Sequence, residues 1–344
     1  MKLFGTIFFL AVLATCPSTF GQQVAIPYEI GTWHGFKPAA ISYTFDDNCP
    51  NQLATAVPLF DKHGFKITLF TVTNWSPNWA GLQAAATNGH EIASHTVTHP
   101  NLDSINETRQ MVELRDSKIR IDSNIVNSNC VTIAYPFCSF SNSKLSSAFY
   151  IAARSCDGSV VPSTPADFMH ISSINCGTEG PGRTATDLNG KVESAIQQNG
   201  WCVFLFHGID NDRAYSPMSS QQLETHLEYV SANKLKYWVA TFGKVVRYIR
   251  ERNAAMLTVN SQGSTRITLS LTDTLDNEIY NYPLTIRRPM PKGWKGVNVM
   301  QGDKKRSAFL VKKDKVVYIQ FDAVPNAGMI IINKLKSALA VVTD

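Results

Sequence analysis

Short apolar runs alternate with longer amphipathic segments from residue 39 to residue 252. Continuous apolar runs are typical of strands buried on both faces, and apolar residues with a period near 3.6 are typical of helices packed on a sheet. The alternation predicts parallel strands joined by crossover helices. The predicted strands are residues 39–45, 66–72, 91–94, 131–135, 150–154, 170–174, 201–206 and 237–240, and the predicted helices are residues 52–63, 82–87, 104–127, 184–198, 219–232 and 242–252.

The longest predicted helix repeats apolar residues seven positions apart, at Ile105, Val112, Ile119 and Val126. Residues at this spacing return to nearly the same side of a helix after two turns. We therefore expect these four side chains to form one buried stripe. The count of predicted strands in this part of the chain suits a barrel.

The pattern changes after residue 252. Strand-like runs separated by turn residues follow, and a helical period is an alternative only near the end of the chain. This pattern predicts a small β-sandwich. We expect two domains, residues 22–252 and residues 253–344. The strand-like runs are residues 255–259, 265–272, 282–286, 296–300, 308–311, 316–321 and 329–332.

The first 21 residues are typical of a secretory signal peptide. Lys2 supplies a basic start, and the apolar run that follows is too short to cross a bilayer. We expect residues 1–21 to be removed and the protein to be secreted, either extracellular or periplasmic. Residues 13–16 also resemble a lipoprotein box, so a lipid anchor at Cys16 is the second interpretation. No later stretch predicts a membrane span.

Composition and charge set few limits on function. The 344 residues are 44% hydrophobic and 17% charged, as in ordinary globular proteins. The net charge is +5, and 13 Lys and Arg against 7 Asp and Glu from Asn253 onward place +6 in the second domain and −1 in the remainder. A basic domain could hold an acidic polysaccharide, but lysines that solubilise turns and protect strand edges are the favoured interpretation. No basic stripe interleaved with aromatic residues indicates nucleic acid binding.

Six cysteines remain after residue 21, an even number that permits disulfides in an exported protein. Several pairings are possible, and the sequence does not choose among them. Buried free thiols, for example at Cys202, are an equally good interpretation. The six are Cys49, Cys130, Cys138, Cys156, Cys176 and Cys202.

Two carboxylates stand where the first predicted strand ends. Residues 39–45 run directly into Asp46 and Asp47. Active sites of parallel α/β folds lie at the carboxyl ends of the strands. Adjacent carboxylates repel each other, so they are tolerated best when a cation lies between them or one is protonated. An Asp pair alone is more often a helix cap or a turn, so its function depends on other residues.

Histidines follow two other predicted strands. His95 and His99 are four residues apart after residues 91–94, and on one helical turn two imidazoles at this spacing can bind the same ion. His207 follows residues 201–206. Two histidines and a carboxylate with one open position are typical of catalytic sites in which zinc or a similar ion activates water. Each motif alone is weak evidence, but three at separate strand ends predict a metal site.

Taken together, these motifs resemble the polysaccharide deacetylases of carbohydrate esterase family four, which share the NodB-homology domain. The motifs are Thr-Phe-Asp-Asp at residues 44–47, Ser-His-x-x-x-His at residues 94–99 and Leu-Phe-His at residues 205–207. The resemblance extends over residues 41–252. It implies an α/β fold, the distorted (β/α) barrel of the deacetylases, for the first domain.

The resemblance also implies a role for each of these residues. Asp47, His95 and His99 would hold one divalent metal ion, with Zn2+ as the first choice. Asp46 would be the general base, and His207 would be the general acid that protonates the leaving amine or alcohol. These roles are compatible with the chemistry of the residue types, because one carboxylate neutralises the ion while the other accepts a proton.

The chain departs from the family in its third motif, which usually reads Arg-x-Pro-Tyr-Gly. Residues 134–138 read Ala-Tyr-Pro-Phe-Cys, so the proline and an aromatic residue of the motif are retained. The backbone N–H of Phe137 is therefore still expected to stabilise an oxyanion. The arginine that orients the catalytic Asp is replaced by Ala134. Arg154 is the candidate substitute, and a plain surface arginine is the alternative. The family's fourth motif, an Asp that tunes the catalytic His, has two candidates here, Asp157 and Asp210.

Three functions are compatible with these residues. The first is a secreted, metal-dependent deacetylase that hydrolyses N-acetyl groups of an amino-sugar polymer of the chitin or peptidoglycan type. The second is an O-acetyl esterase that acts on acetylxylan or another hemicellulose. The third, a non-catalytic carbohydrate-binding protein, is disfavoured because a binding module has no need of a base, an acid and three metal ligands. The expected partner is an acetylated polysaccharide or oligosaccharide.

Overall fold

Strand β2 (Ala39–Asp46) lies at the centre of the larger sheet and is buried along its whole length. The computed structural model describes residues 27–139 and 142–343. Within these residues, the larger sheet has the strand order β6-β5-β4-β3-β2-β8-β7, with β9 paired to β2, and every pair is parallel. The other strands are β3 (Thr68–Thr71), β4 (Glu91–Ser94), β5 (Thr132–Ala134), β6 (Ala152–Arg154), β7 (Ile174–Asn175), β8 (Trp201–Phe206) and β9 (Tyr237–Val239).

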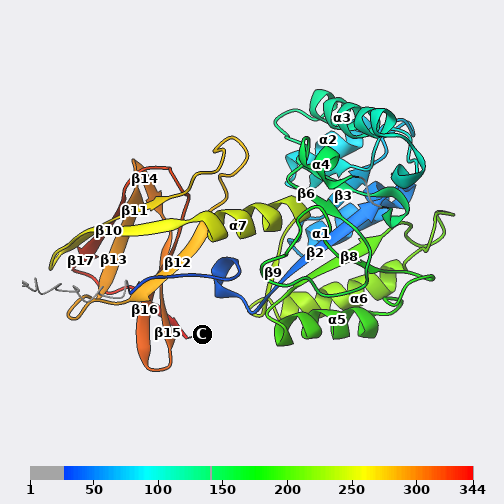
Figure 1. The fold of residues 1–344 in the computed structure, drawn as a ribbon. Coiled ribbons are helices and arrows are strands. Elements are labelled where there is room, and N and C mark those ends of the chain that lie inside the picture. The colour runs from blue at the N-terminus through cyan, green and yellow to red at the C-terminus, as the bar shows by residue number, and fades with distance from the viewer. Residues whose placement is uncertain (1–26, 140–141, 344) are drawn as a thin grey trace, which may run out of the picture.

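The sheet curls into an irregular barrel. Ile171 forms a parallel bridge with Arg154 of β6, and β7, three residues later, pairs with β8. The short segment from Ile171 to β7 therefore connects the two ends of the sheet. The predicted distorted (β/α) barrel is confirmed. Its helices, which lie outside the sheet (Figure 1), are α1 (Val57–Lys62), α2 (Trp79–Thr87), α3 (Glu107–Asn124), α4 (Ser143–Ser147), α5 (Ala185–Gln197), α6 (Ser220–Ala232) and α7 (Phe242–Ala254).

The helix predicted for residues 52–63 is divided into two parts. The first is a π-helix, η2 (Gln52–Ala56), and the second is α1. Pro58, in the first turn of α1, has no N–H to donate to the carbonyl group one turn before it. The α-helix begins at Val57, so the proline lies in its first turn, where a missing N–H is tolerated. The part of the chain that forms the barrel also contains three 3-10 helices: η1 (His34–Phe36), η3 (Leu102–Ser104) and η4 (Pro136–Cys138).

The prediction that four apolar residues form one buried stripe on the longest helix is wrong. Ile119 is 53% exposed and Val126, which lies beyond the end of α3, is 67% exposed. Leu114 and Ile121, also seven residues apart, face the barrel instead. The helix begins three residues later and ends three residues earlier than predicted, so a periodicity that includes its flanks identifies the wrong face.

The chain after α7, together with β1 (Glu29–Ile30) from before the barrel, forms two sheets of five strands each, which confirms the predicted β-sandwich. Their strand orders are β1-β12-β16-β15-β18 and β10-β11-β17-β13-β14, and all pairs except β15 with β18 are antiparallel. The end of the chain is a strand rather than a helix. The strands are β10 (Met256–Gln262), β11 (Arg266–Thr272), β12 (Leu284–Pro289), β13 (Gly296–Gln301), β14 (Lys304–Arg306), β15 (Ala308–Lys313), β16 (Val316–Ala323), β17 (Ile330–Leu335) and β18 (Val341–Thr343).

The two units share contacts on both sides of residue 252. Strand β1 (Glu29–Ile30) precedes the barrel in the sequence but pairs with β12 of the sandwich. Leu284 of β12 belongs to the same buried cluster as Trp238 and Tyr248 of the barrel unit. Helix α7 lies between the two units (Figure 1). A division into residues 22–252 and 253–344 falls two residues before the end of α7, and it remains a proposal for the domain boundary.

Glu251 on α7 is fully buried at this junction. Its Oε2 accepts a hydrogen bond of 3.1 Å from the N–H of Tyr282, and Oε1 has no hydrogen bond within the described residues. Burial raises the pKa of Glu251 from 4.5 to about 8. Between about pH 4.5 and about pH 8 the folded protein therefore keeps a proton on Glu251 that the unfolded chain has released. The free energy of unfolding contributed by this group falls as the pH rises through this range.

We expect Glu251→Gln to raise the melting temperature most at about pH 9 and least at about pH 5, because the amide cannot ionise. Thermal unfolding of wild type and variant across this range measures the effect. Glu228→Gln, at an exposed position of α6, is the control and should give a pH-independent difference. If the melting temperatures of wild type and Glu251→Gln differ by the same amount at every pH, a group other than Glu251 causes the pH dependence of stability.

No helix in the described ranges, 27–139 and 142–343, is long and apolar enough to cross a membrane. The predicted signal peptide, residues 1–21, and the alternative lipid anchor at Cys16 lie outside the described residues.

Candidate active site and metal centre

The predicted site residues gather at the carboxyl ends of five strands, with Phe137 after β5 in addition to the residues of β2, β4, β6 and β8. Parallel strands all end on the same side of the barrel, so residues far apart in the sequence meet there. They line a cavity of about 520 Å³. The cavity is lined by Asp46 at the end of β2 and Asp47 directly after it, His95 and His99 after β4, Arg154 at the end of β6 and His207 after β8, together with Tyr135, Phe137, Cys138, Cys156, Asn175, Leu205 and Tyr215.

His95 and His99 lie in a loop, so the prediction that they share one helical turn is wrong. Thr96 has φ 68° and His99 has φ 59°, values of the left-handed region that an α-helix does not contain. The loop turns back on itself and brings the two imidazole rings to 4.8 Å between centroids. The spacing of four residues therefore still brings the two imidazoles together, but through a loop rather than a helical turn.

A buried carboxylate on α3 holds this loop in place. Glu113, which is 1% exposed, accepts hydrogen bonds from the N–H groups of Val97 (2.9 Å) and Thr98 (2.8 Å). It also accepts a bond of 2.7 Å from the Thr98 hydroxyl. Sequence reasoning missed this residue because a glutamate in an amphipathic helix is usually a solvated one.

Two amide side chains that the sequence did not single out support the aspartates. The amide nitrogen of Gln52 donates to the carbonyl oxygens of Asp46 and His207, which joins the ends of β2 and β8. The Asn48 side chain exchanges two hydrogen bonds, of 2.8 and 3.1 Å, with the backbone of Val72 after β3. These bonds fix the sharp turn in which Asp47 (φ 74°) and Asn48 (φ 54°) both adopt left-handed conformations.

The proposed metal ligands have the spacing that one ion requires. Asp47 Oδ1 lies 3.5 Å from His95 Nε2 and 3.3 Å from His99 Nε2, and the three ligand atoms all lie within 4.8 Å of one another. Donors bound to one tetrahedral zinc ion are about 3.4 Å apart. His95 Nδ1 lies 2.8 Å from the carbonyl oxygen of Ala134, which leaves the Nε2 lone pair for an ion. Asp47 Oδ1 is buried and has no hydrogen bond among the described residues, as expected of a ligand atom.

The surroundings of Asp47 and His99 favour the protonation states that metal binding needs. At His95, burial opposes the charged form, but the carboxylates of Asp46 and Asp47 raise the pKa. Burial alone would raise the pKa of Asp47, but His95, His207 and His99 lower it to about 2. Burial and the neighbouring His95 lower the pKa of His99 to about 4. At neutral pH the carboxylate is therefore ionised and His99 is neutral, which is the form in which each binds a cation.

Arg154 lies against Asp46 in the interior. Its Nη2 donates to Oδ2 of Asp46, and the two side chains are 1% and 3% exposed. Arg154 is the register partner of Ala134 across the β5–β6 pair, so it stands beside the position where the family motif carries arginine. Its Nη1 donates to Ser173 Oγ at 3.1 Å. Asp46 Oδ1 is buried without a hydrogen bond in the described part of the chain, so this oxygen is available to a substrate or a water molecule.

His207 approaches Asp47 from the other side of the cavity. Its Nε2 lies 3.8 Å from Asp47 Oδ2, and burial lowers its pKa. Neither candidate for the tuning Asp contacts it. Asp157 lies 2.9 Å from His170, and Asp210 accepts from the N–H of Ser220 at the start of α6. Each Asp side chain therefore bonds to a residue other than His207.

A disulfide between Cys138 and Cys156 joins the loops that follow β5 and β6, with 5.7 Å between the Cα atoms. Phe137, immediately before Cys138, has φ 57° and a side chain that is 68% exposed. The disulfide therefore anchors the loop that carries the expected oxyanion donor. The remaining cysteines of the described residues, Cys49, Cys130, Cys176 and Cys202, are free and buried.

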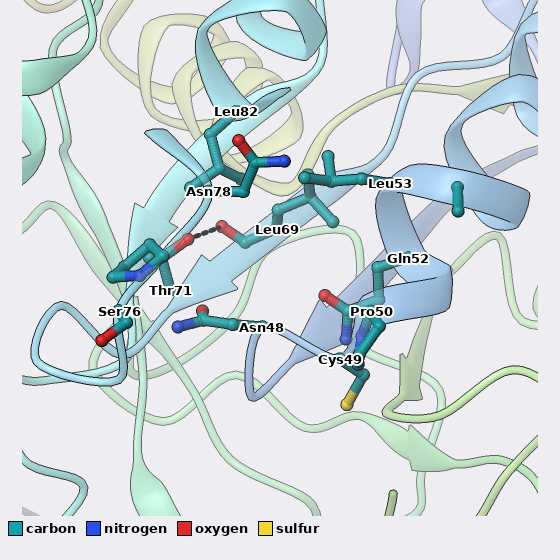
Figure 2. A pocket seen from close by; sticks show the side chains of 12 residues that line it. Asn48, Cys49, Pro50, Gln52, Leu53, Leu69, Thr71, Ser76, Asn78 and Leu82 are labelled. Carbon is teal, nitrogen blue, oxygen red and sulfur yellow. Dashed lines mark hydrogen bonds between the residues drawn. The ribbon is translucent and has the colours of Figure 1, made fainter. Parts of the chain in front are cut away.

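A second cavity, of about 540 Å³, begins one residue beyond Asp47. Figure 2 shows that Asn48 and Cys49 lie on one side of it and that Ser76 and Asn78, from the loop after β3, lie on the other. Its apolar wall consists of Leu53, Leu69 and Leu82.

Comparisons with known proteins show similarity to polysaccharide deacetylases over the first part of the chain. Residues 35–152 match the family model described as polysaccharide deacetylase. Over 324 residues the chain is 29% identical to a gellan lyase from Bacillus sp, covering 88% of this chain and 13% of that protein. Over 137 residues it is 29% identical to YxkH, a candidate polysaccharide deacetylase of Bacillus subtilis (strain 168), covering 37% of this chain and 49% of that protein. The chain thus spans less than half the length of either relative.

Among solved structures, a candidate polysaccharide deacetylase from Mycobacterium smegmatis is 15% identical to this chain. The superposition has a TM-score of 0.49 and covers 66% of this chain and 96% of the other.

Proposed function

We propose that the chain contains a polysaccharide deacetylase domain, as the match of residues 35–152 to that family model supports, and that it is a secreted, metal-dependent deacetylase that removes N-acetyl groups from an amino-sugar polymer. Polysaccharide deacetylases are hydrolases that act on acetylated carbohydrates. The observation that carries the proposal is one cavity in which three metal ligands, a buried carboxylate and a histidine converge.

The residues fit the steps of amide hydrolysis. A divalent ion held by Asp47, His95 and His99 would polarise the acetyl carbonyl group and activate water. Asp46 would accept the proton of the attacking water through Oδ1, while Arg154 holds its Oδ2. His207, on the opposite side of the cavity, would donate a proton to the leaving nitrogen.

The backbone N–H of Phe137 would stabilise the oxyanion. An O-acetyl ester could react through the same residues, because its leaving alcohol also needs a proton. Acetate release from chitooligosaccharides and from acetylxylan separates the amide and ester activities. Release from neither substrate would support a carbohydrate-binding protein without catalysis.

The disulfide supports export. Disulfides form and persist in oxidising compartments and are rare in the cytosol. Cys138 and Cys156 are paired at the mouth of the site. We therefore propose that the protein acts outside the cytosol, and retention of this bond in protein purified from its native host tests the point.

We predict that the protein binds one zinc ion and that His95→Ala loses most of it, because the variant removes a ligand that no neighbouring group replaces. Elemental analysis of dialysed protein measures the zinc content of both. His63→Ala, at the outer end of α1, is the matched histidine control and should retain zinc. Equal zinc content in wild type and His95→Ala would refute the ligand assignment.

A further inference from the structure

Positive charge gathers at one end of the β-sandwich. Eight exposed lysine and arginine side chains lie there, at strand ends or in turns, and one carboxylate, Asp314, lies among them. Eight positive charges against one negative charge give this end +7 among the described residues. The eight residues, here called the basic pole, are Arg266, Lys292, Lys295, Lys312, Lys313, Lys315, Lys334 and Lys336.

Strand pairing in one sheet brings three of these cations together. The N–H of Lys334 on β17 donates to the carbonyl of Thr265 at 2.9 Å, and Arg266 begins β11 directly after Thr265. Val297 of β13, two residues after Lys295, pairs with Lys334. Lys295, Lys334 and Arg266 therefore lie at the same end of three adjacent strands.

The second sheet contributes the other lysines to this end. Lys313 pairs with Val316 across the turn between β15 and β16. The N–H of Met290 donates to the carbonyl of Val317 at 2.8 Å, so the end of β12 lies beside this turn. Met290 begins the loop that runs from β12 to β13 and carries two lysines of the pole. This loop connects the cations of the two sheets.

The pole is the end of the sandwich that lies away from the barrel. Strand β10 begins at Met256, two residues after α7, and runs away from α7 toward the turn that precedes Arg266 (Figure 1). Acidic residues collect at the other end, in the segment that follows β11: Asp273, Asp276 and Glu278. A ligand on the pole would therefore leave the cavity of the metal centre free.

The cations of the pole have no carboxylate partners. None of the eight forms an ion pair within residues 27–139 and 142–343. Two other arginines of the sandwich do have partners. Arg287 pairs with Glu29 at 2.7 Å, and Arg288 donates to the hydroxyl group of Tyr28 at 2.8 Å. The unpaired cations are therefore concentrated rather than spread over the domain.

Protection of strand edges explains a different group of cations. Strand β14, at the edge of its sheet, consists of Lys304, Lys305 and Arg306. Arg266 and Lys334 belong instead to β11 and β17, which are interior strands. The expectation that lysines protect strand edges fits β14 but does not account for the pole.

We propose that the basic pole binds a polyanionic glycan, a polysaccharide that carries carboxylate or phosphate groups along its chain. Clustered cations repel one another, and approaching anions relieve this repulsion. Seven of the eight cations are lysines, whose compact charge imposes no fixed fork geometry and suits anions repeated along a flexible polymer. The proposal goes beyond the proposed function and shares with it only the export of the protein.

The surroundings of the pole favour a glycan over a membrane or a nucleic acid. Anchoring at a membrane interface and binding of single strands both use exposed aromatic rings. Trp294, in the loop between β12 and β13, is 7% exposed, and its indole N–H donates to the carbonyl of Ser264 at 2.8 Å. This ring therefore belongs to the core. Export, which the Cys138–Cys156 disulfide supports, also favours extracellular polymers.

The test measures binding of the full-length protein to polymers of defined charge. The probes are polygalacturonate, which carries carboxylates, poly(glycerol phosphate), which carries phosphates, and uncharged dextran. We expect binding to an anionic polymer but not to dextran, and a loss of about tenfold in affinity between about 0.05 M and about 0.5 M salt, because salt screens exposed charges. Comparison of the two anionic polymers separates carboxylate from phosphate recognition.

Two triple variants remove charge from different parts of the pole. One combines Lys312→Gln, Lys313→Gln and Lys315→Gln, and the other combines Arg266→Gln, Lys334→Gln and Lys336→Gln. Each should weaken binding about tenfold, because an exposed ion pair contributes only a few-fold in affinity and three are lost. The control combines Lys304→Gln, Lys305→Gln and Arg306→Gln on β14, which changes the net charge equally. At about 0.15 M salt, where exposed charges act over about 8 Å, the control should lose less than about twofold.

Three results would overturn the proposal. The first is an equal loss of affinity in the pole variants and in the β14 control, because affinity would then follow net charge alone. The second is the absence of binding to both anionic polymers. The third is tighter binding to phosphatidylglycerol vesicles or to duplex DNA than to either polymer. Melting temperatures identify a variant that does not fold, and the other triple variant then decides.

Acetate release from an N-acetylated oligomer is a separate measurement on the same proteins. Pole-dependent binding by a protein that releases no acetate would leave the pole standing and remove the deacetylase assignment. Acetate release by a protein that binds neither anionic polymer would do the reverse.

Discussion

Asp46→Asn is expected to lower kcat by about 10²–10⁴-fold while the protein keeps its metal ion, because an amide preserves the shape of the carboxylate but cannot accept a proton. Asp46 has the geometry of a base, since Arg154 holds one oxygen and the other has no hydrogen bond within the described ranges. Acetate release from an N-acetylated oligomer and zinc content measure the two effects.

Asp157→Asn is the matched control. Asp157 pairs with His170 outside the cavity, so this variant should retain activity. Since Asp46→Asn leaves Arg154 without its counter-charge, its melting temperature must be measured alongside its activity. If Asp46→Asn loses its zinc, the roles of Asp46 and Asp47 are exchanged.

The second large effect concerns Arg154→Ala. We expect it to destabilise the protein by about 3–5 kcal/mol, because it removes the arginine that donates to the buried carboxylate of Asp46. We also expect kcat to fall and the acidic limb of its pH profile to move to higher pH, since a lone buried carboxylate favours its protonated form. Denaturant unfolding and pH–rate profiles measure these changes, and zinc content should be nearly unchanged.

Two further variants distinguish a positioning role from a structural one. Arg154→Lys retains the charge and should restore part of the pH profile, although lysine lacks the planar fork of arginine. The double variant Asp46→Asn with Arg154→Met removes both charges and should be more stable than Arg154→Ala, because no unpaired ion remains. A pH profile of Arg154→Ala that coincides with that of wild type would contradict the positioning role.

The barrel was predictable because burial on both faces leaves a strong pattern in the sequence. Strands β4 and β8 match their predicted limits, since each is an apolar run bounded by polar residues. The boundaries of β7 and α3 were less predictable. β7 has only two residues, and the limits of α3 depend on caps such as Asn106, whose side chain accepts from the N–H of Arg109.

The position of the candidate site followed from the same pattern. Residues that end parallel strands must share one edge of the sheet, so Asp47, His95 and His207 could be grouped before their distances were known. The pairing of Arg154 with Asp46 was a weaker expectation. It depends on the register that places Arg154 beside Ala134, and register is a property of neighbouring strands rather than of one segment.

The sequence by itself determined the strand and helix order, the edge at which charged residues collect and the identity of the candidate ligands, because these depend on local periodicity and residue chemistry. Only the tertiary structure decided how the loops between them are held. Three kinds of contact join segments that the sequence separates: the hydrogen bonds of Glu113 to the His95 loop, the Cys138–Cys156 bond, and the ring contacts of Trp75 with His99 and of Tyr215 with His207. Such contacts have no local periodicity, since their partners are chosen by the packing of the whole barrel.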